Sequence, residues 1–319
     1  MVVEDWKHNI VICPPAQNVG LAFPRNDWSD ENKAKVEDYD EGVHSYVWGN
    51  NSMNAIGQRE EDRPEIAFSL VGTVSWPEPT GRNVNMLPFI MGDKDSLPDE
   101  LRPYYELIKK CPVNHHEHGR VVYLTVSEGY VDAKSTQRRS GLHIEAAGGI
   151  ADGVEGSFQA GEESNWGGGV YWGGGFSSSA SPDDFEGGLY MASNMNDTCM
   201  LWDALVNKGK GMTDFHGGGE HLRPFIGEGT MLKANELAWL TDRTPHEALP
   251  QTKSGYRQFF RLVTSNISVW FKEHSTPNPK VPIPDYVQIV EGNKFSSPIH
   301  ETTIDESKPP ATKKLKAGA

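Results

Sequence analysis

The chain contains a series of short runs rich in β-branched and aromatic residues, separated by turn-forming glycine and proline residues. Such runs are typical of β-strands, because branched and aromatic side chains pack well on a pleated surface. One example is GRVVYLTVSEGYV at residues 119–131. We expect a strand or a hairpin at residues 64–76. Further strands are expected at residues 140–146, 187–194, 229–242 and 256–271. Many strands with frequent turns favour a barrel or a sandwich.

Two segments have the features of helices. Residues 97–111 carry acidic residues at the start and two lysines at the end, which suits the helix dipole. Pro103 within this segment predicts a kink or a late start. We expect a short helix at residues 197–209, with Asp197 as its cap and Gly209 as its stop. The predicted fold class is therefore mainly β with a few flanking helices.

The length of 319 residues is sufficient for one large β domain with a sizeable core. We expect a single domain over residues 1–295, with its core at about 64–273. Residues 1–60 are polar and rich in turn signals, so no element is assigned there. Residues 296–319 are polar and rich in proline and lysine, and we predict that they form a disordered tail.

The formal net charge is −14, with 44 acidic and 30 basic residues. This balance gives no basic surface for nucleic acid or for an anionic membrane, so the expected partner is a small molecule. The sequence leaves the oligomeric state open.

The three cysteines match no zinc spacing or disulfide framework, which fits a reducing compartment. There is no apolar run of signal length at the start and no later run of the roughly 20 apolar residues that a membrane span needs. We therefore expect a cytoplasmic protein. The sequence KKLK in the tail leaves a nuclear location as a second interpretation.

Residues 146–180 contain eleven glycines and the tetrapeptide WGGG twice. A loop of this length in a compact domain is usually functional or disordered. One interpretation is a lid over a binding site, in which Trp172 is a candidate for substrate contact. A tolerated surface insertion is an equally good interpretation.

A histidine and a glutamate stand two residues apart in SGLHIEA, at His143 and Glu145. Side chains alternate between the faces of a strand, so these two should point to one side, while Leu142 and Ile144 point to the other. A histidine and a carboxylate on one face supply two of the three ligands of a 2-His-1-carboxylate metal site.

The best candidate for the third ligand is His246 in WLTDRTPHEALP, because it follows one apolar strand and precedes another. The rivals His216, Glu220 and His221 lie in a glycine-rich turn, without an arginine about a dozen residues downstream on a strand. The cluster HHEH at residues 115–118 repeats the H-x-E spacing, but its place between turn residues favours a solvated loop.

Eleven residues beyond His246, the sequence GYRQFFRL places Arg257, Phe259 and Arg261 on one face of an expected strand. Two arginines beside a phenylalanine are costly to bury unless anions meet them. A guanidinium group binds a carboxylate well through two parallel hydrogen bonds. The sequence therefore offers a metal site with one or two anion-binding groups beside it.

The order HIE, a long insertion, TPHE and then YRQFFRL resembles the Fe(II)/2-oxoglutarate-dependent oxygenases over roughly residues 119–273. That resemblance implies a double-stranded β-helix, which is a jelly-roll or cupin-like barrel. It further implies that His143, Glu145 and His246 hold Fe(II), and that Arg257 binds the distal carboxylate of the cosubstrate 2-oxoglutarate. Glu145 stands where aspartate is commoner, and some members of the superfamily use the longer residue.

The same resemblance implies an O2-dependent oxidation of a substrate C–H bond, by hydroxylation, desaturation or ring closure, with release of succinate. A small acidic metabolite suits Arg261 as a substrate contact, with Arg138 and Arg139 as further candidates. Arg261 could instead support Arg257. Two alternatives remain: a cupin-like metalloenzyme that does not use 2-oxoglutarate, and a non-catalytic β-barrel binding protein.

Overall fold

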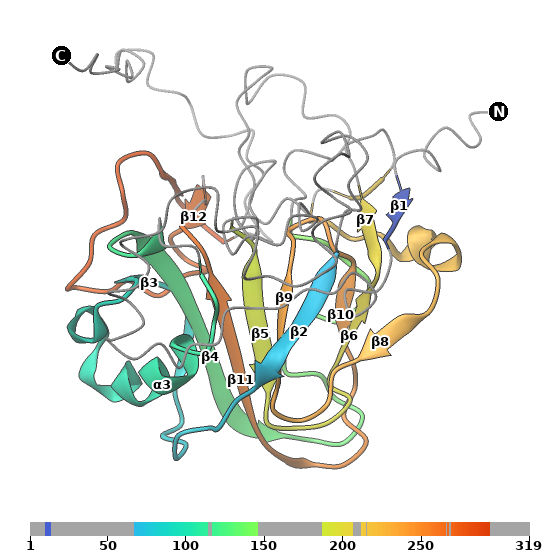
Figure 1. Ribbon diagram of the computed structural model, residues 1–319, viewed down its shortest axis with the longest axis horizontal. Coiled ribbons are helices and arrows are strands. Elements are labelled where there is room, and N and C mark those ends of the chain that lie inside the picture. The colour runs from blue at the N-terminus through green and yellow to red at the C-terminus, as the bar shows by residue number, and fades with distance from the viewer. Residues whose placement is uncertain are drawn as a thin grey trace, which may run out of the picture.

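The computed structural model describes residues 10–13, 67–113, 117–145, 187–206, 212–214, 216–265, 267 and 269–293 (Figure 1). Within these ranges the protein is mainly β, with few and short helices. The strand pairs are antiparallel except for one parallel pair of short strands, β12 (Val269–Phe271) with β13 (Gln288–Val290). The predicted fold class is thus confirmed at the level of a mainly β, antiparallel architecture.

The largest sheet has six strands in the spatial order β2-β9-β5-β11-β4-β3. Its longest members, β4 and β11, are neighbours in this sheet and pair along nine residues (Figure 1). The bounds are β2 (Phe68–Thr73), β9 (Glu236–Leu240), β5 (Leu189–Ser193), β11 (Gly255–Val263), β4 (Val121–Val131) and β3 (Asn83–Ile90).

A smaller sheet of three strands has the order β10-β6-β8. Its members are β10 (His246–Ala248), β6 (Cys199–Trp202) and β8 (Gly229–Met231), and β1 (Ile10–Ile12) pairs separately with β7 (Ala204–Val206). No sheet closes into a barrel within the described residues. The expected jelly-roll closure is therefore not part of the observed topology.

Strand β11 is buried on both faces, without interruption from Arg257 to Val263. Phe259 and Val263 lie in the hydrophobic cluster that also contains Leu201 of the smaller sheet. Phe260 and Leu262 lie in a second cluster on the opposite face. Two short helical elements contribute to this second cluster, namely η6 (Asp99–Tyr104) and α3 (Tyr105–Ile108). A third, η5 (Lys94–Ser96), ends just before Leu97 of the same cluster.

Five of the six expected strand segments contain strands, and two of them, residues 229–242 and 256–271, contain two strands each. The exception is residues 140–146, where His143 forms only isolated bridges instead of a regular strand. Strand β3 was not predicted from the sequence. It contains Pro88, which does not favour a strand. Proline is tolerated there because β3 is at the edge of the sheet and pairs with β4 alone.

The helical prediction for residues 97–111 is confirmed, and the α-helical turn begins only at Tyr105, after Pro103. The prediction of a helix at residues 197–209 is wrong, because this segment forms β6 and β7. Asp197 has a φ of 56°, so it occupies a turn instead of capping a helix. β6 lies between β10 and β8, and this long-range pairing overrides the local helical pattern.

Several predictions fall outside the described residues. These are the turns of the N-terminal part, the lid interpretation of residues 146–180 with Trp172, and the tail at 296–319. All three cysteines are buried. None of the helices in the described part of the chain combines the length and the apolar character needed to cross a membrane.

Candidate metal centre

The segment that carries His143 and Glu145 is held by backbone hydrogen bonds. His143 forms bridges to His246 on one side and to Gly218 on the other. The N–H of each histidine donates to the carbonyl of the other, at N···O distances of 3.0 and 2.9 Å. The Glu145 N–H donates to the carbonyl of Asp242 at 2.9 Å. Two histidines about a hundred positions apart in the sequence are thus joined by their backbones.

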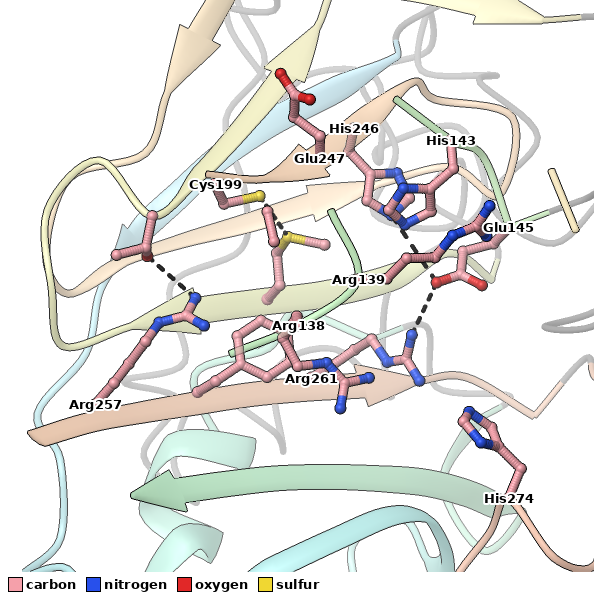
Figure 2. Close-up of a pocket in the computed structure, with 14 residues that line it drawn as sticks. Arg138, Arg139, His143, Glu145, Cys199, His246, Glu247, Arg257, Arg261 and His274 are labelled. Carbon is pink, nitrogen blue, oxygen red and sulfur yellow. Dashed lines mark hydrogen bonds and ion pairs between the residues drawn. The ribbon is translucent and has the colours of Figure 1, made fainter. Parts of the chain in front are cut away.

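The predicted alternation of side chains in this segment is confirmed, although the segment is not a regular strand. Leu142 and Ile144 are buried in a hydrophobic cluster with Trp202 of β6. His143 and Glu145 point away from that cluster and line a pocket (Figure 2). Extended backbone is enough to produce this alternation, because successive side chains then point to opposite sides.

Each imidazole is oriented by a carbonyl two residues earlier in the chain. His143 Nδ1 lies 2.7 Å from the carbonyl oxygen of Gly141, and His246 Nδ1 lies 2.9 Å from that of Thr244. Since a carbonyl only accepts, each Nδ1 carries the proton and each Nε2 is left with a lone pair. The ring centroids are 4.4 Å apart. Hydrogen bonds of this kind orient the histidine ligands of metal sites.

Glu145 completes a compact group with the two histidines. The ligand atoms of His143, Glu145 and His246 all lie within 4.8 Å of one another, and all three residues are buried. His246 Nε2 is 3.9 Å from Glu145 Oε1. Two neutral nitrogens and one carboxylate oxygen at this spacing could bind a metal ion and leave further coordination positions open.

Burial affects the protonation of the two histidines. It holds the pKa of His143 well below its usual value, and the neighbouring His246 adds to this effect. Burial also lowers the pKa of His246, against the opposing effect of the Glu145 charge. Both histidines are therefore neutral at pH 7, which is the form in which imidazole binds a metal.

The rival ligands for the third position do not join this group. His221 is exposed, and the Glu220 carboxylate accepts hydrogen bonds from Arg223 and from the backbone N–H of Leu142. Among the described residues, His143, Glu145 and His246 are the one group with metal-ligand spacing. The glycine-rich turn has a structural role instead, because its Gly218 pairs with the His143 segment.

Glu117 belongs to the other H-x-E sequence, HHEH, and it is buried, so the solvated loop predicted for this cluster is wrong at Glu117. Its carboxylate accepts hydrogen bonds from the N–H and the hydroxyl of Ser265, at 2.8 and 3.0 Å. His115 lies outside the described residues.

Arg257 lies at the far end of the same pocket from the His143–Glu145–His246 group (Figure 2). It is buried, and its three guanidinium nitrogens donate to Ser193 Oγ, Gln137 Oε1 and Thr198 Oγ1 at 3.0 to 3.2 Å. These partners are all neutral. Burial lowers the pKa of Arg257 to about 10, so the group remains a cation at neutral pH without a carboxylate beside it.

Arg261 also lies in the pocket but has an anionic partner. Its Nη1 donates to Glu145 Oε1 at 2.8 Å. The two residues are 116 positions apart in the sequence, and the sequence analysis assigned Arg261 to the substrate or to Arg257. The structure instead shows it in contact with the Glu145 carboxylate of the candidate metal site.

Arg138 and Arg139 both line the pocket. Arg139 Nη1 donates to the backbone carbonyl of His216 at 2.5 Å. The Arg138 guanidinium lies over the ring of Phe259, with 5.2 Å from Cζ to the ring centroid.

Three polar residues at the site were missed by the sequence analysis, namely Gln137, Ser193 and Thr198. They surround the Arg257 guanidinium, yet none belongs to a recognisable motif. The remaining lining residues that were not predicted are Met191, Cys199, Glu247, Ala248 and His274. A local signal existed only for Ser193, which ends a predicted strand.

Comparisons of this chain with protein-family models, with curated proteins and with solved structures find no match. The functional conclusion therefore depends on the chemistry of the pocket alone.

Proposed function

We propose that this protein is an Fe(II)- and 2-oxoglutarate-dependent oxygenase that oxidises a C–H bond of a small metabolite. The observation that carries the proposal is the buried Arg257 guanidinium, which has only neutral partners and shares a pocket with a buried His-Glu-His group. A buried cation without a counter-ion is costly, and this cost is recovered when an anionic ligand binds.

The dimensions of β11 support 2-oxoglutarate as that ligand. A strand advances roughly 3.3 Å per residue, so the backbone at Arg257 is about 13 Å from that at Arg261, which contacts Glu145. A dicarboxylate that reaches from a metal at the His-Glu-His group towards Arg257 fits a pocket that has Arg261 beside the metal group and Arg257 at the other end. The guanidinium fork of Arg257 suits the distal carboxylate.

The donor set supports a redox-active metal. Two imidazole nitrogens and one carboxylate are the 2-His-1-carboxylate set that non-haem Fe(II) oxygenases use, and the open positions on such a metal accept cosubstrate and O2. When bound, Fe(II) would activate O2, and 2-oxoglutarate would be oxidised to succinate and CO2. One oxygen atom of O2 ends in succinate, and the other ends in the hydroxylated product or in water.

The residues of this chain orient the reactants and limit the access of water. Gly141 and Thr244 fix the two imidazole rings, and Arg261 holds the Glu145 carboxylate. Ser193 and Thr198 orient the Arg257 guanidinium. We further propose that the two antiparallel sheets belong to a double-stranded β-helix.

The decisive experiment incubates the full chain with Fe(II), ascorbate, O2 and 2-oxoglutarate, and measures succinate. Isotopically labelled 2-oxoglutarate distinguishes this succinate from any that was carried over. We expect slow succinate release by the wild type and none by His246→Ala. A metabolite extract added to the same mixture should then show, by mass spectrometry, a compound that gains one oxygen or loses two hydrogens.

The two alternatives give different results in this assay. A cupin-like enzyme without 2-oxoglutarate would bind metal but release no succinate, and its metal content would be unaffected by Arg257→Gln. A non-catalytic binding protein would bind neither metal nor 2-oxoglutarate. Tight metal binding together with succinate release that depends on Arg257 would exclude both.

A further inference from the structure

The Arg138 guanidinium is a charged group that the proposed reaction does not use. It lies in the pocket, over the Phe259 ring. It makes no hydrogen bond or ion pair with any residue in the described part of the chain. The residue is half-buried, and its guanidinium has five N–H donors that an anionic ligand in the pocket could use.

The surroundings of Arg138 make its positive charge costly. The Arg257 guanidinium lies over the same Phe259 ring, with the same Cζ-to-centroid distance of 5.2 Å. Burial lowers the pKa of Arg138 to about 9, and repulsion by Arg261 and Arg257 adds to the effect of burial. The cation–π contact with Phe259 offsets only part of this cost.

The nearest acidic side chain does not neutralise Arg138. Glu145 attracts Arg138 at longer range, but its carboxylate makes its 2.8 Å ion pair with Arg261. The other acidic residue of the pocket, Glu247, accepts two hydrogen bonds from Arg223, each of 2.9 Å. Neither carboxylate is therefore available as a direct partner of Arg138.

Binding of 2-oxoglutarate would leave the Arg138 charge without a counter-ion. In the proposed complex the distal carboxylate of 2-oxoglutarate neutralises Arg257, and its other end lies at the metal. Arg138 then remains an unpaired cation beside the space left for the prime substrate.

We propose that Arg138 binds an anionic group of the prime substrate, a carboxylate or a phosphate-type oxyanion, in a subsite next to Phe259. The guanidinium can bind either group through two parallel hydrogen bonds. The reaction assigned to this substrate rests on the proposed function, whereas the anion subsite itself rests on the geometry around Arg138.

The first test uses acetate and inorganic phosphate as probes of the subsite. Each is titrated calorimetrically into the full chain saturated with Mn(II) and 2-oxoglutarate. Wild type should bind at least one of the two probes, and Arg138→Gln should weaken that binding at least tenfold. Arg138→Lys keeps the charge and should recover part of the affinity. The preferred probe shows whether the subsite is made for a carboxylate or for a phosphate.

The control variant is Arg102→Gln, which removes the same charge from a surface helical element where Arg102 pairs with Asp95 and Asp99. It should bind the probes like wild type. Melting temperatures of all variants are measured in parallel to establish that each one folds. Equal probe affinity in wild type and Arg138→Gln overturns the subsite.

A second arm separates this inference from the proposed function. It omits metal and 2-oxoglutarate and compares Arg257→Gln with the double variant Arg257→Gln/Arg138→Gln, so that Arg257 cannot bind the probe. Loss of probe binding only in the double variant supports the subsite even if wild type fails to bind 2-oxoglutarate. If 2-oxoglutarate binds normally but removal of Arg138 changes nothing, the function stands and the subsite is wrong.

The substrate class is tested in the metabolite extract. Compounds consumed by wild type should carry a carboxylate or phosphate, and Arg138→Gln should consume them at least tenfold more slowly at low concentration. Consumption of a neutral compound at the same rate by both proteins would contradict the inference.

Discussion

The two faces of β11 both bury polar side chains, but they differ in how these groups are satisfied. On one face, Gln258 and Tyr104 donate to the Glu128 carboxylate, which also accepts from the backbone N–H groups of Thr80 and Arg82. On the other face, Arg257 has only neutral partners. The chain itself completes the first polar cluster, whereas the second contains a cation without an anionic partner, which the proposed cosubstrate would supply.

This difference separates structural polar groups from functional ones. A satisfied buried cluster contributes to the stability of the fold, since removing one member leaves its partners unpaired. A buried charge without a counter-ion lowers stability and persists where binding requires it. Substitutions in the Glu128 cluster should therefore lower stability and leave binding unchanged. Substitution of Arg257 should weaken binding without lowering stability.

The largest effect is expected from the metal-binding group. His143→Ala and His246→Ala should each abolish metal-dependent turnover and reduce metal affinity by at least a hundredfold, because the ligands act as one unit. The melting temperature without metal should change little. Metal content by mass spectrometry and melting curves measure both quantities.

His216→Ala and His221→Ala are the matched controls. These two histidines were the rival candidates for the third ligand, and neither belongs to the group of His143, Glu145 and His246. They should retain metal and turnover. If His246→Ala kept its metal while either control lost it, the third ligand would be wrongly assigned.

Arg257→Gln should produce the next largest effect. Loss of a charged, bidentate partner in a buried pocket costs on the order of 2 to 5 kcal/mol of 2-oxoglutarate binding. Stability without ligand should stay the same or rise, because an uncompensated buried charge is removed. Calorimetric titration with 2-oxoglutarate and a chemical denaturation curve are the two measurements. Unchanged affinity for 2-oxoglutarate would favour the cupin-like alternative.

Arg261→Gln tests whether Arg261 acts through Glu145. Removing a residue that orients a metal ligand typically lowers metal affinity about 10- to 100-fold. We expect this loss, because the 2.8 Å ion pair fixes the Glu145 carboxylate. Arg261→Lys should restore part of the affinity. Normal metal binding with a specific loss of substrate binding would instead support the original assignment of Arg261 to the substrate.

Glu128→Gln should have the smallest effect, and on folding alone. The neutral amide weakens several charge-assisted hydrogen bonds, which should lower the free energy of unfolding by about 1 to 2 kcal/mol at pH 7. Affinity for metal and 2-oxoglutarate should match wild type. A loss of binding without a loss of stability would contradict the structural role of this face.

Glu128 should also make the stability of the protein depend on pH. Burial opposes ionisation of Glu128, but the hydrogen bonds from Tyr104 and from the backbone outweigh it and hold its pKa below the usual 4.5. Its contribution to stability is therefore fully present above that value and is lost as the pH falls towards the folded-state pKa. Wild type should lose its advantage over Glu128→Gln in denaturation curves recorded at decreasing pH below 4.5.

Five of the six strands of the largest sheet lie in segments that the sequence predicted as strands, with β3 as the exception. Side-chain alternation is a property of extended backbone, so the placement of Arg257, Phe259 and Arg261 on one face needed only the order of residues. The placement of His143 and Glu145 on one side of their segment followed in the same way. The choice of His246 over His216 depended on flanking strands, and the structure brings His246 to the pair.

Only the tertiary structure decided which groups meet across the sheets. Residues 197–209 form strands because they pair with segments far away in the sequence, and no local pattern reports such partners. Arg261 contacts Glu145, and Arg138 lies near the guanidinium groups of Arg261 and Arg257. These residues are far apart in the sequence, and only the folded chain brings them together. The sequence by itself determined the chemistry of the side chains and their local direction. Whether each charge has a counter-ion depends on long-range packing, and here that packing leaves Arg138 and Arg257 in the pocket without a carboxylate partner.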